Sequence, residues 1–329
     1  MSLCQRNIRS LFLRFGCGFL LYLLCMGFTH AEAAWPRTVQ DAYGAITLTK
    51  PPARIVSTSV TLTGSLLALD APVIASGATT PHSRISDDQG FLRQWSGVAR
   101  ERHLQRLYVA EPNAEAIAMQ MPDLIVISAS GNDSALRLRD QLSSIAPTLV
   151  VNYDDKSWQD VTRQLAYATG LEANAERIID AFDQRVRFLK THLHHPDHAV
   201  SALVYANQGH SIHLWTPASA QGQLLQQLGF TLATLPSHLR DTGRMGVRKD
   251  IVTLSGETLS QGLTGGTFLL LGNDQQAADQ LLDDRFLAHL PAVQSRRVYA
   301  LGSDTFRLDY YSASQLIERL AQLYGESST

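Results

Sequence analysis

Two arginines and a tryptophan are the side chains whose types and positions suggest ligand binding. Arg84, Trp215 and Arg307 each end or follow a predicted strand, where ligands bind in open α/β sheets. Arginine keeps its charge, donates hydrogen bonds in a planar fork and stacks on rings, and tryptophan adds a large aromatic surface. Facing one cleft, the three would suit a ligand that is both anionic and aromatic. Each also has a structural alternative, since an arginine can pair with a nearby aspartate and a tryptophan can pack in the core.

Signals for catalysis are weaker. The run Ser57-Thr58-Ser59 follows a predicted strand, and Ser57 could act as a nucleophile with His82 as its base. No G-x-S-x-G motif or glycine-rich phosphate loop surrounds the run, so helix capping is the better interpretation. An exported hydrolase stays an alternative function.

Two clusters of basic side chains favour structural roles. The first comprises Arg100, Arg102, His103 and Arg106. It is typical of a solvated basic face, with a phosphate site as the alternative. The second comprises His192, His194, His195 and His198. It follows a long predicted helix, whose C-terminal end favours cationic or hydrogen-bonding side chains, with a zinc or copper site as the alternative.

Residues 157–196 are predicted to form the helices that position these side chains. Ser157 can cap a first helix, which Gly170 ends, and residues 172–194 form a long run without glycine or proline before Pro196. That run has a single apolar stripe at helical spacing and would span roughly 35 Å. We expect a linking helix between two lobes; an ordinary packed helix inside one domain is the alternative.

Short apolar runs alternate with amphipathic ones on both sides of this helix. The predicted strands lie at 54–57, 73–75, 123–128, 148–151, 200–205, 268–271 and 297–301, with a further one that leads to Trp215. The alternation predicts the α/β class, with two doubly wound lobes, at 34–156 and 197–329, and a ligand in the cleft between them. The second lobe is expected to repeat the layout of the first.

Residues 1–33 read as a signal peptide, with three arginines, an apolar core and an A-x-A site that predicts cleavage after Ala33. An uncleaved anchor, or a lipoprotein modified at Cys17 or Cys25, is the alternative. All three cysteines lie in this segment, so the mature chain has no disulfide and no thiolate metal site. We expect a monomer in the periplasm.

The charge of the chain argues against nucleic acid as a partner. The 329 residues carry a formal charge of −2, and removing three arginines and one glutamate with the signal peptide leaves −4 for the remaining 296. A negative chain gives no reason to expect binding to nucleic acid or to a membrane surface.

Several runs carry a resemblance that covers the whole mature chain. They are Arg54–Pro81, Ile145–Leu149, Asn152–Trp158, Leu214–Pro217 and Thr305–Ala313. On these runs the chain resembles the siderophore, haem and vitamin B12 solute-binding proteins of ABC importers, and within them the ferric enterobactin carriers. The resemblance implies two α/β lobes bridged by one long helix.

The resemblance also implies a ligand and roles for individual residues. The ligand would be ferric enterobactin, a trianionic tris-catecholate that wraps its iron completely, so no cofactor, protein metal ligand or catalytic residue is expected. Arg84 and Arg307 would neutralise catecholate oxygens and Trp215 would cover a ring, with Tyr310 and Tyr311 as weaker candidates.

The partners implied are transport proteins. Glu115 and Glu257 would dock the two lobes on the permease of an inner-membrane ABC importer, unless they are only acids favoured at helix N-termini. The outer-membrane energy-coupling machinery is a further candidate partner. A carrier for haem or cobalamin is the alternative function within this family, and it would need an apolar cleft lined by tyrosine and histidine.

Overall fold

A computed structural model describes residues 35–41, 43–154, 156–206, 211–240 and 250–325. The predicted signal peptide and its cleavage site after Ala33 lie outside the described residues, as does the segment 241–249. No helix within the described ranges is long and apolar enough to cross a membrane.

The first lobe is built on a parallel sheet with the strand order β5-β4-β3-β6-β7. Its strands are β3 (Ile55–Ser57), β4 (Val73–Ala78), β5 (Gln105–Val109), β6 (Leu124–Ser128) and β7 (Thr148–Val151). Its helices are α2 (Val60–Ala68), α3 (Arg93–Glu101), α4 (Ala114–Ala118) and α5 (Arg139–Ser143), with the 3-10 turn η1 (Leu136–Leu138). A hairpin of β1 (Arg37–Asp41) and β2 (Gly44–Leu48) precedes them. The doubly wound lobe predicted from the sequence is confirmed.

The second lobe has a mixed sheet, with the order β10-β9-β8-β11-β12. Its strands are β8 (Val200–Ala206), β9 (Ser211–Trp215), β10 (Ile251–Ser255), β11 (Thr267–Leu270) and β12 (Val298–Ala300). Strands β8, β11 and β12 are parallel, as in the first lobe, but β8, β9 and β10 are antiparallel. Only four residues join β8 to β9, and a parallel crossover needs a dozen or more, so the expectation of a repeated layout is wrong at this edge.

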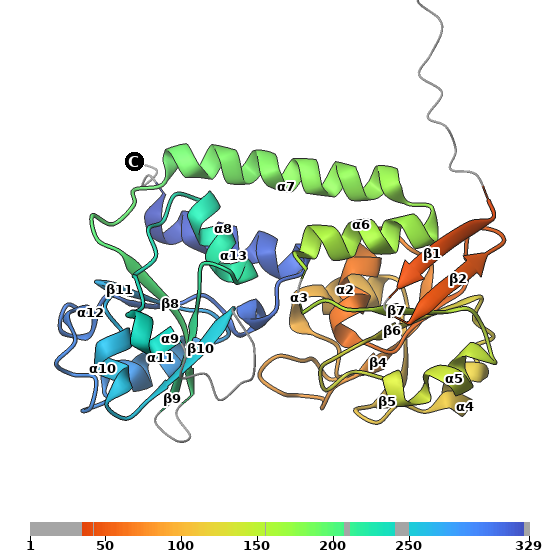
Figure 1. Ribbon diagram of the computed structural model, residues 1–329, viewed down its shortest axis with the longest axis horizontal. Coiled ribbons are helices and arrows are strands. Elements are labelled where there is room, and N and C mark those ends of the chain that lie inside the picture. Colours follow the sequence, from red (N-terminus) through yellow and green to blue (C-terminus); the bar gives the residue numbers. More distant parts are fainter. Residues whose placement is uncertain (1–34, 42, 155, 207–210, 241–249, 326–329) are drawn as a thin grey trace, which may run out of the picture.

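Two helices, α6 (Trp158–Thr169) and α7 (Glu172–His192), form the segment that links the lobes. Ser157 caps α6 by accepting a hydrogen bond from the Asp160 amide, and Gly170 ends it with a φ of 78°. At 21 residues, α7 is about 32 Å long and runs along both lobes (Figure 1). It ends at His192, two residues before the predicted end, because extended Leu193 forms a β-bridge with Gly325.

The final helix, α13 (Tyr310–Tyr324), lies beneath α7 and packs on α2 and α3 of the first lobe as well as on α7 itself. An ion pair between Arg185 of α7 and Glu318 of α13, with distances of 2.8 and 2.9 Å, joins the two helices. The remaining helices of the second lobe are α8 (Ala220–Gln227), α9 (Ser237–Arg240), α10 (Thr258–Gly262), α11 (Gln275–Leu282) and α12 (Pro291–Gln294), with the 3-10 turn η2 (Ser303–Phe306).

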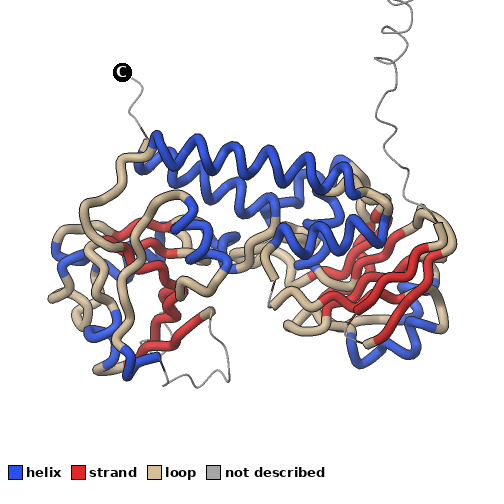
Figure 2. Tube along the Cα trace, turned by 45° about the horizontal axis from the view of Figure 1, so that its top comes forward, coloured by secondary structure: helices blue, strands red, loops and turns tan. Residues whose placement is uncertain are grey.

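One hydrophobic core serves both lobes. Alternate strand residues, such as Val126 in β6 and Val204 in β8, point to the side of α6, α7 and α13 and belong to one continuous cluster. The opposite faces of the two sheets, with Ile125 and Leu203, pack into two separate clusters. Figure 2 shows the sheets of the two lobes side by side against this layer of helices. The lobes are therefore joined by packed helices and not by an unstructured linker.

Candidate ligand-binding cleft

A cleft of about 1000 Å³ lies between the lobes, where the parallel strands of both sheets end. Side chains that line it from the first lobe include Thr58, Arg84, Tyr108, Asp133 and Tyr153. Those from the second lobe include Tyr205, His213, Gln280, Phe306 and Arg307. The position agrees with the general rule for open α/β sheets, in which loops at the carboxyl ends of strands hold the ligand.

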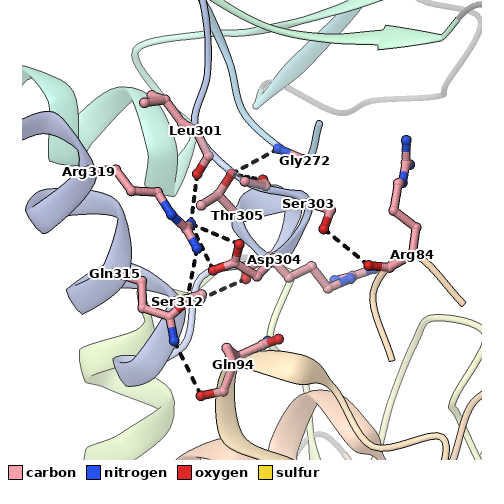
Figure 3. A network of polar contacts seen from close by, with 12 residues as sticks. Arg84, Gln94, Gly272, Leu301, Ser303, Asp304, Thr305, Ser312, Gln315 and Arg319 are labelled. Atoms are coloured by element: carbon pink, nitrogen blue, oxygen red, sulfur yellow. Dashed lines mark hydrogen bonds and ion pairs between the residues drawn. The ribbon is translucent and has the colours of Figure 1, made fainter. Parts of the chain in front are cut away.

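The structure brings the two predicted arginines into this one cleft. Arg84 lies on the exposed loop after β4, and within the described part of the chain no hydrogen bond or ion pair engages its guanidinium. Its carbonyl oxygen accepts a hydrogen bond of 3.2 Å from the Ser303 hydroxyl of the other lobe (Figure 3). Arg307 faces the cleft from the second lobe, with 38% of its side chain exposed. The two positive charges thus approach a ligand from opposite lobes.

A network of polar contacts fixes the loop that carries Arg307 (Figure 3). Arg319 of α13 donates to both carboxylate oxygens of Asp304, at 2.8 and 3.0 Å, and to the Leu301 carbonyl at 2.7 Å. Buried Gln221 of α8 donates to the carbonyls of Thr305 and Phe306 at 3.2 and 2.7 Å. Because its backbone is held on two sides, the loop presents Phe306 and Arg307 in a defined orientation.

Trp215 does not reach the cleft, although the sequence predicts that it covers the ligand. Its side chain is 5% exposed, belongs to the shared core, and lines a smaller cavity of about 180 Å³ that adjoins the cleft at Phe306 and Arg307. Phe306, which is 40% exposed, lies edge-on over it at a centroid distance of 5.4 Å and lines the cleft in its place. The sequence placed Trp215 at a strand end but could not show that the neighbouring loop covers it.

Tyr310 and Tyr311, the weaker ligand candidates, line neither cavity. Tyr310 packs edge-on against Trp158 and Tyr311, at centroid distances of 5.8 and 5.4 Å. Both tyrosines are half-buried at the start of α13 and pack against the shared core. The structure therefore places them in the packing of the last helix.

Ser57 is fully buried, and its hydroxyl donates to the Ser59 carbonyl at 3.0 Å, so it is not accessible to a substrate. Ser59 caps α2 by accepting from the Leu62 amide, as predicted for this run. The proposed base, His82, is exposed and lines neither cavity. The structure offers no support for a serine nucleophile here.

The side chains of the two basic clusters are either exposed to solvent or in contact with other parts of the protein. Arg100, Arg102, His103 and Arg106 are all exposed, as a solvated face requires. In the histidine cluster, His192 stacks on Phe188, His195 contacts the Leu228 carbonyl, and His198 contacts the Thr267 hydroxyl. Among the described residues, no group of three histidine, cysteine or acidic side chains is placed to hold a metal ion.

Several cleft residues were not selected from the sequence. Tyr108 is the penultimate residue of β5, a strand that was not predicted, and Asp133 lies in the loop after β6. Tyr153 comes two residues after β7, so the rule that selected Arg84 and Arg307 could also have found it. Arg307 lies over its ring at 4.5 Å, and one guanidinium nitrogen is 3.4 Å from the Asp154 carboxylate.

His213 gives the cleft a titratable group whose pKa is shifted by burial. It contacts the Thr253 hydroxyl at 3.0 Å, and burial lowers its pKa below the usual 6.5. Below pH 6.5 the unfolded chain therefore binds a proton at His213 more readily than the folded protein does. The stability that neutral His213 contributes is fully present above pH 6.5 and is lost as the pH falls below that value.

Urea midpoints measured from about pH 7.5 to about pH 5 should fall less steeply in His213→Gln than in the parent. Parallel curves would assign the acid sensitivity to other groups.

The two acids predicted to dock on a permease lie outside the cleft. Glu115 is exposed in the first turn of α4, and Glu257 is exposed at the N-cap of α10. Neither lines a cavity. Both helices lie on the side of the molecule opposite α7, one in each lobe (Figure 1). A partner that contacted this side could touch both lobes at once.

Comparisons with known proteins agree with the fold and with the resemblance. Residues 55–305 match the family model described as "Periplasmic binding protein". The chain is 58% identical over 303 residues to the ferric enterobactin-binding periplasmic protein FepB of Escherichia coli O6:H1, which covers 92% of this chain and 95% of that protein. It is 31% identical to the Fe(3+) dicitrate-binding periplasmic protein FecB of Escherichia coli K12 over 43% of each chain.

Solved structures show the same architecture. The crystal structure of holo-ViuP aligns with a TM-score of 0.79 and 37% identity, covering 89% of this chain and 96% of that one. Staphylococcus aureus SirA complexed with staphyloferrin B aligns with a TM-score of 0.64 at 19% identity, over 87% and 97% of the two chains, and supports the fold alone. The predicted fold class and the stated resemblance are both confirmed. This chain is a member of the periplasmic binding protein family.

Proposed function

We propose that this chain binds ferric enterobactin in the periplasm and delivers it to an inner-membrane ABC importer. The observation that carries the proposal is the cleft itself, with Arg84 and Arg307 facing it from opposite lobes. The similarity to the ferric enterobactin-binding periplasmic protein of Escherichia coli, which extends over nearly the whole of both chains, supports the same ligand.

The acidic side chains of the cleft do not cancel this positive charge. Asp304 accepts two hydrogen bonds from Arg319, and Asp133 accepts from the Ser59 hydroxyl, the Thr61 amide and the Tyr153 hydroxyl. Arg319 thus offsets the charge of Asp304, and neutral donors stabilise the charge of Asp133 without removing it. Arg307 lies 3.4 Å from Asp154, so Arg84, whose guanidinium has no partner among the described residues, is the cation most available to a trianionic ferric catecholate.

The iron needs no ligand from the protein in this proposal, because the siderophore wraps it completely. The cleft tyrosines are already engaged: Tyr108 donates to the Thr58 carbonyl at 3.1 Å, and Tyr205 donates to Asp284 at 3.0 Å. Burial raises the pKa of Tyr205 to about 12 and that of Tyr108 also above its usual value, which disfavours the phenolate that would bind a metal. These phenols are therefore protonated and hydrogen-bonded in the ligand-free protein, and the haem titration described next tests that alternative.

Intrinsic fluorescence titrations with ferric enterobactin, haem and cobalamin test the ligand. Ferric enterobactin should quench the tryptophan fluorescence and saturate at the lowest concentration of the three. Tighter binding of haem or cobalamin would overturn the proposal in favour of another carrier of this family. Sedimentation of the purified protein should show a monomer, with or without ligand.

Glu115 and Glu257 are expected to serve delivery and not binding. Replacing both with alanine should leave the affinity for ferric enterobactin nearly unchanged while iron uptake falls severalfold, because both acids are exposed outside the cleft. Uptake by cells that depend on this protein gives the measurement. A double variant of two other exposed acids, Glu101→Ala with Asp279→Ala, controls for the loss of charge. Equal losses of binding and uptake would place the two glutamates in the ligand site instead.

A further inference from the structure

Tyr153 contacts an arginine of the other lobe with its ring, which suggests a role in ligand binding besides core packing. It is 9% exposed, follows β7 in the first lobe, and faces the cleft. The guanidinium of Arg307, from the second lobe, lies over its ring at 4.5 Å from the centroid. An arginine stacked on an aromatic face loses much of its freedom to move while its edge keeps its hydrogen-bond donors. The ring thus acts as a support for the arginine that faces the ligand.

The loop after β6 is built around the hydroxyl of this tyrosine. The hydroxyl lies 3.1 Å from both the Asp133 carboxylate and the Ser130 carbonyl and donates to either. Gly131 has a φ of +86°, and a Cβ at this position would collide with the Tyr153 hydroxyl, so two independent reasons require glycine here. The loop therefore fixes both the position and the tilt of the ring.

Asp133 is itself fixed from the start of α2. Its second carboxylate oxygen accepts from the Ser59 hydroxyl and, at 3.1 Å, from the Thr61 amide in the first turn of that helix. A carboxylate at a helix N-terminus is stabilised by the unpaired amides and the helix dipole. Asp133 can thus hold Tyr153 inside an anion-binding cleft with its own charge offset.

We propose that Tyr153 positions Arg307 for the ligand, and that Asp133 positions Tyr153. The chain of contacts runs from α2 through Asp133 and Tyr153 of the first lobe to Arg307 of the second. It therefore also links the two lobes at the cleft. The proposal rests on the proposed function for its ligand, ferric enterobactin, but the placement of Arg307 can be measured without any ligand.

A double-mutant cycle separates positioning from a structural role. Tyr153→Leu should weaken ferric enterobactin binding by roughly twofold to thirtyfold, the range of a partly desolvated cation–π contact. In an Arg307→Ala background the same substitution should have no further effect, since the group it positions is gone. Tyr108→Leu is the matched control, because Tyr108 lines the same cleft and donates to the Thr58 carbonyl instead. Its effect should be the same in both backgrounds. An equal factor for Tyr153→Leu in both backgrounds would overturn the proposal.

The side-chain NMR signal of Arg307 gives the ligand-free test. Its Hε proton, assigned with Arg307→Lys, should be shifted upfield by the ring current in the parent and should move downfield in Tyr153→Leu but not in Tyr108→Leu. An unmoved signal would overturn the proposal even if ferric enterobactin proves not to be the ligand. Failure of the parent to bind ferric enterobactin would instead count against the proposed function alone.

Tyr153→Phe serves if the leucine variant does not fold. It keeps the ring and removes the hydroxyl that Asp133 holds. A smaller loss of affinity, absent in the Arg307→Ala background, is then expected. A loss of the same size in both backgrounds would overturn the proposal.

Discussion

Replacing both Arg84 and Arg307 with alanine is expected to weaken ferric enterobactin binding by roughly 100-fold to 10,000-fold. A hydrogen bond between charged groups contributes about 1.5–3 kcal/mol, and the two arginines lie on opposite lobes, so their losses should add. Each single variant should lose about tenfold to somewhat over a hundredfold. Lysine at either position should recover only part, because the planar fork and its stacking are lost. Fluorescence titration measures all of these affinities.

The fold should survive both substitutions, since both side chains reach solvent. The ion pair between Arg307 and Asp154 is half-exposed and contributes little to stability. Circular dichroism checks folding, and Arg100→Ala with Arg106→Ala, two exposed arginines outside the cleft, is the matched control for net charge. A folded double variant that binds as tightly as the parent would mean that charge in the cleft does not hold the ligand.

Replacing Trp215 with alanine is expected to destabilise the protein by about 3–5 kcal/mol while changing ligand affinity little. The indole is nearly fully buried in the core shared by both lobes, so its removal leaves a cavity under Phe306. Urea denaturation followed by circular dichroism gives the loss of stability. Trp215→Phe, which keeps an aromatic ring in place, should lose much less.

Replacing Phe306 with alanine should have the opposite effect to replacing Trp215. It is 40% exposed and lines the cleft, so Phe306→Ala should cost binding and leave stability almost unchanged. If Trp215→Ala instead lost affinity with its stability intact, the indole would contact the ligand, as the sequence alone suggested.

Local chemistry made the linking helices predictable. The cap at Ser157, the left-handed Gly170 and the apolar stripe of α7 are set by neighbouring residues, and the structure confirms all three. The end of α7 was predicted two residues too late, because Leu193 is captured by Gly325, far along the chain. Such contacts between distant residues leave no periodic signal.

The missed strands lie at the edges of the two sheets. Residues of β5 are exposed or half-buried, and β10 pairs with one neighbour only, so neither shows the continuous apolar run of β6 or β11. The candidate site shows the same limit. The rule for strand ends located Arg84, Trp215 and Arg307, but whether a side chain faces the cleft or the core depends on which loop covers it.

The position of α13 has a consequence for how the chain folds. Residues 310–324 pack on α2 and α3, which lie more than 200 residues earlier, so the first lobe cannot complete its core until this helix has been made. Contacts between such distant residues slow folding, because a long loop must close before they stabilise anything. We therefore expect the two lobes to fold together and not as two successive units. A chain whose first lobe stays open until late in synthesis remains unfolded for longer, which suits passage across a membrane as an extended polypeptide.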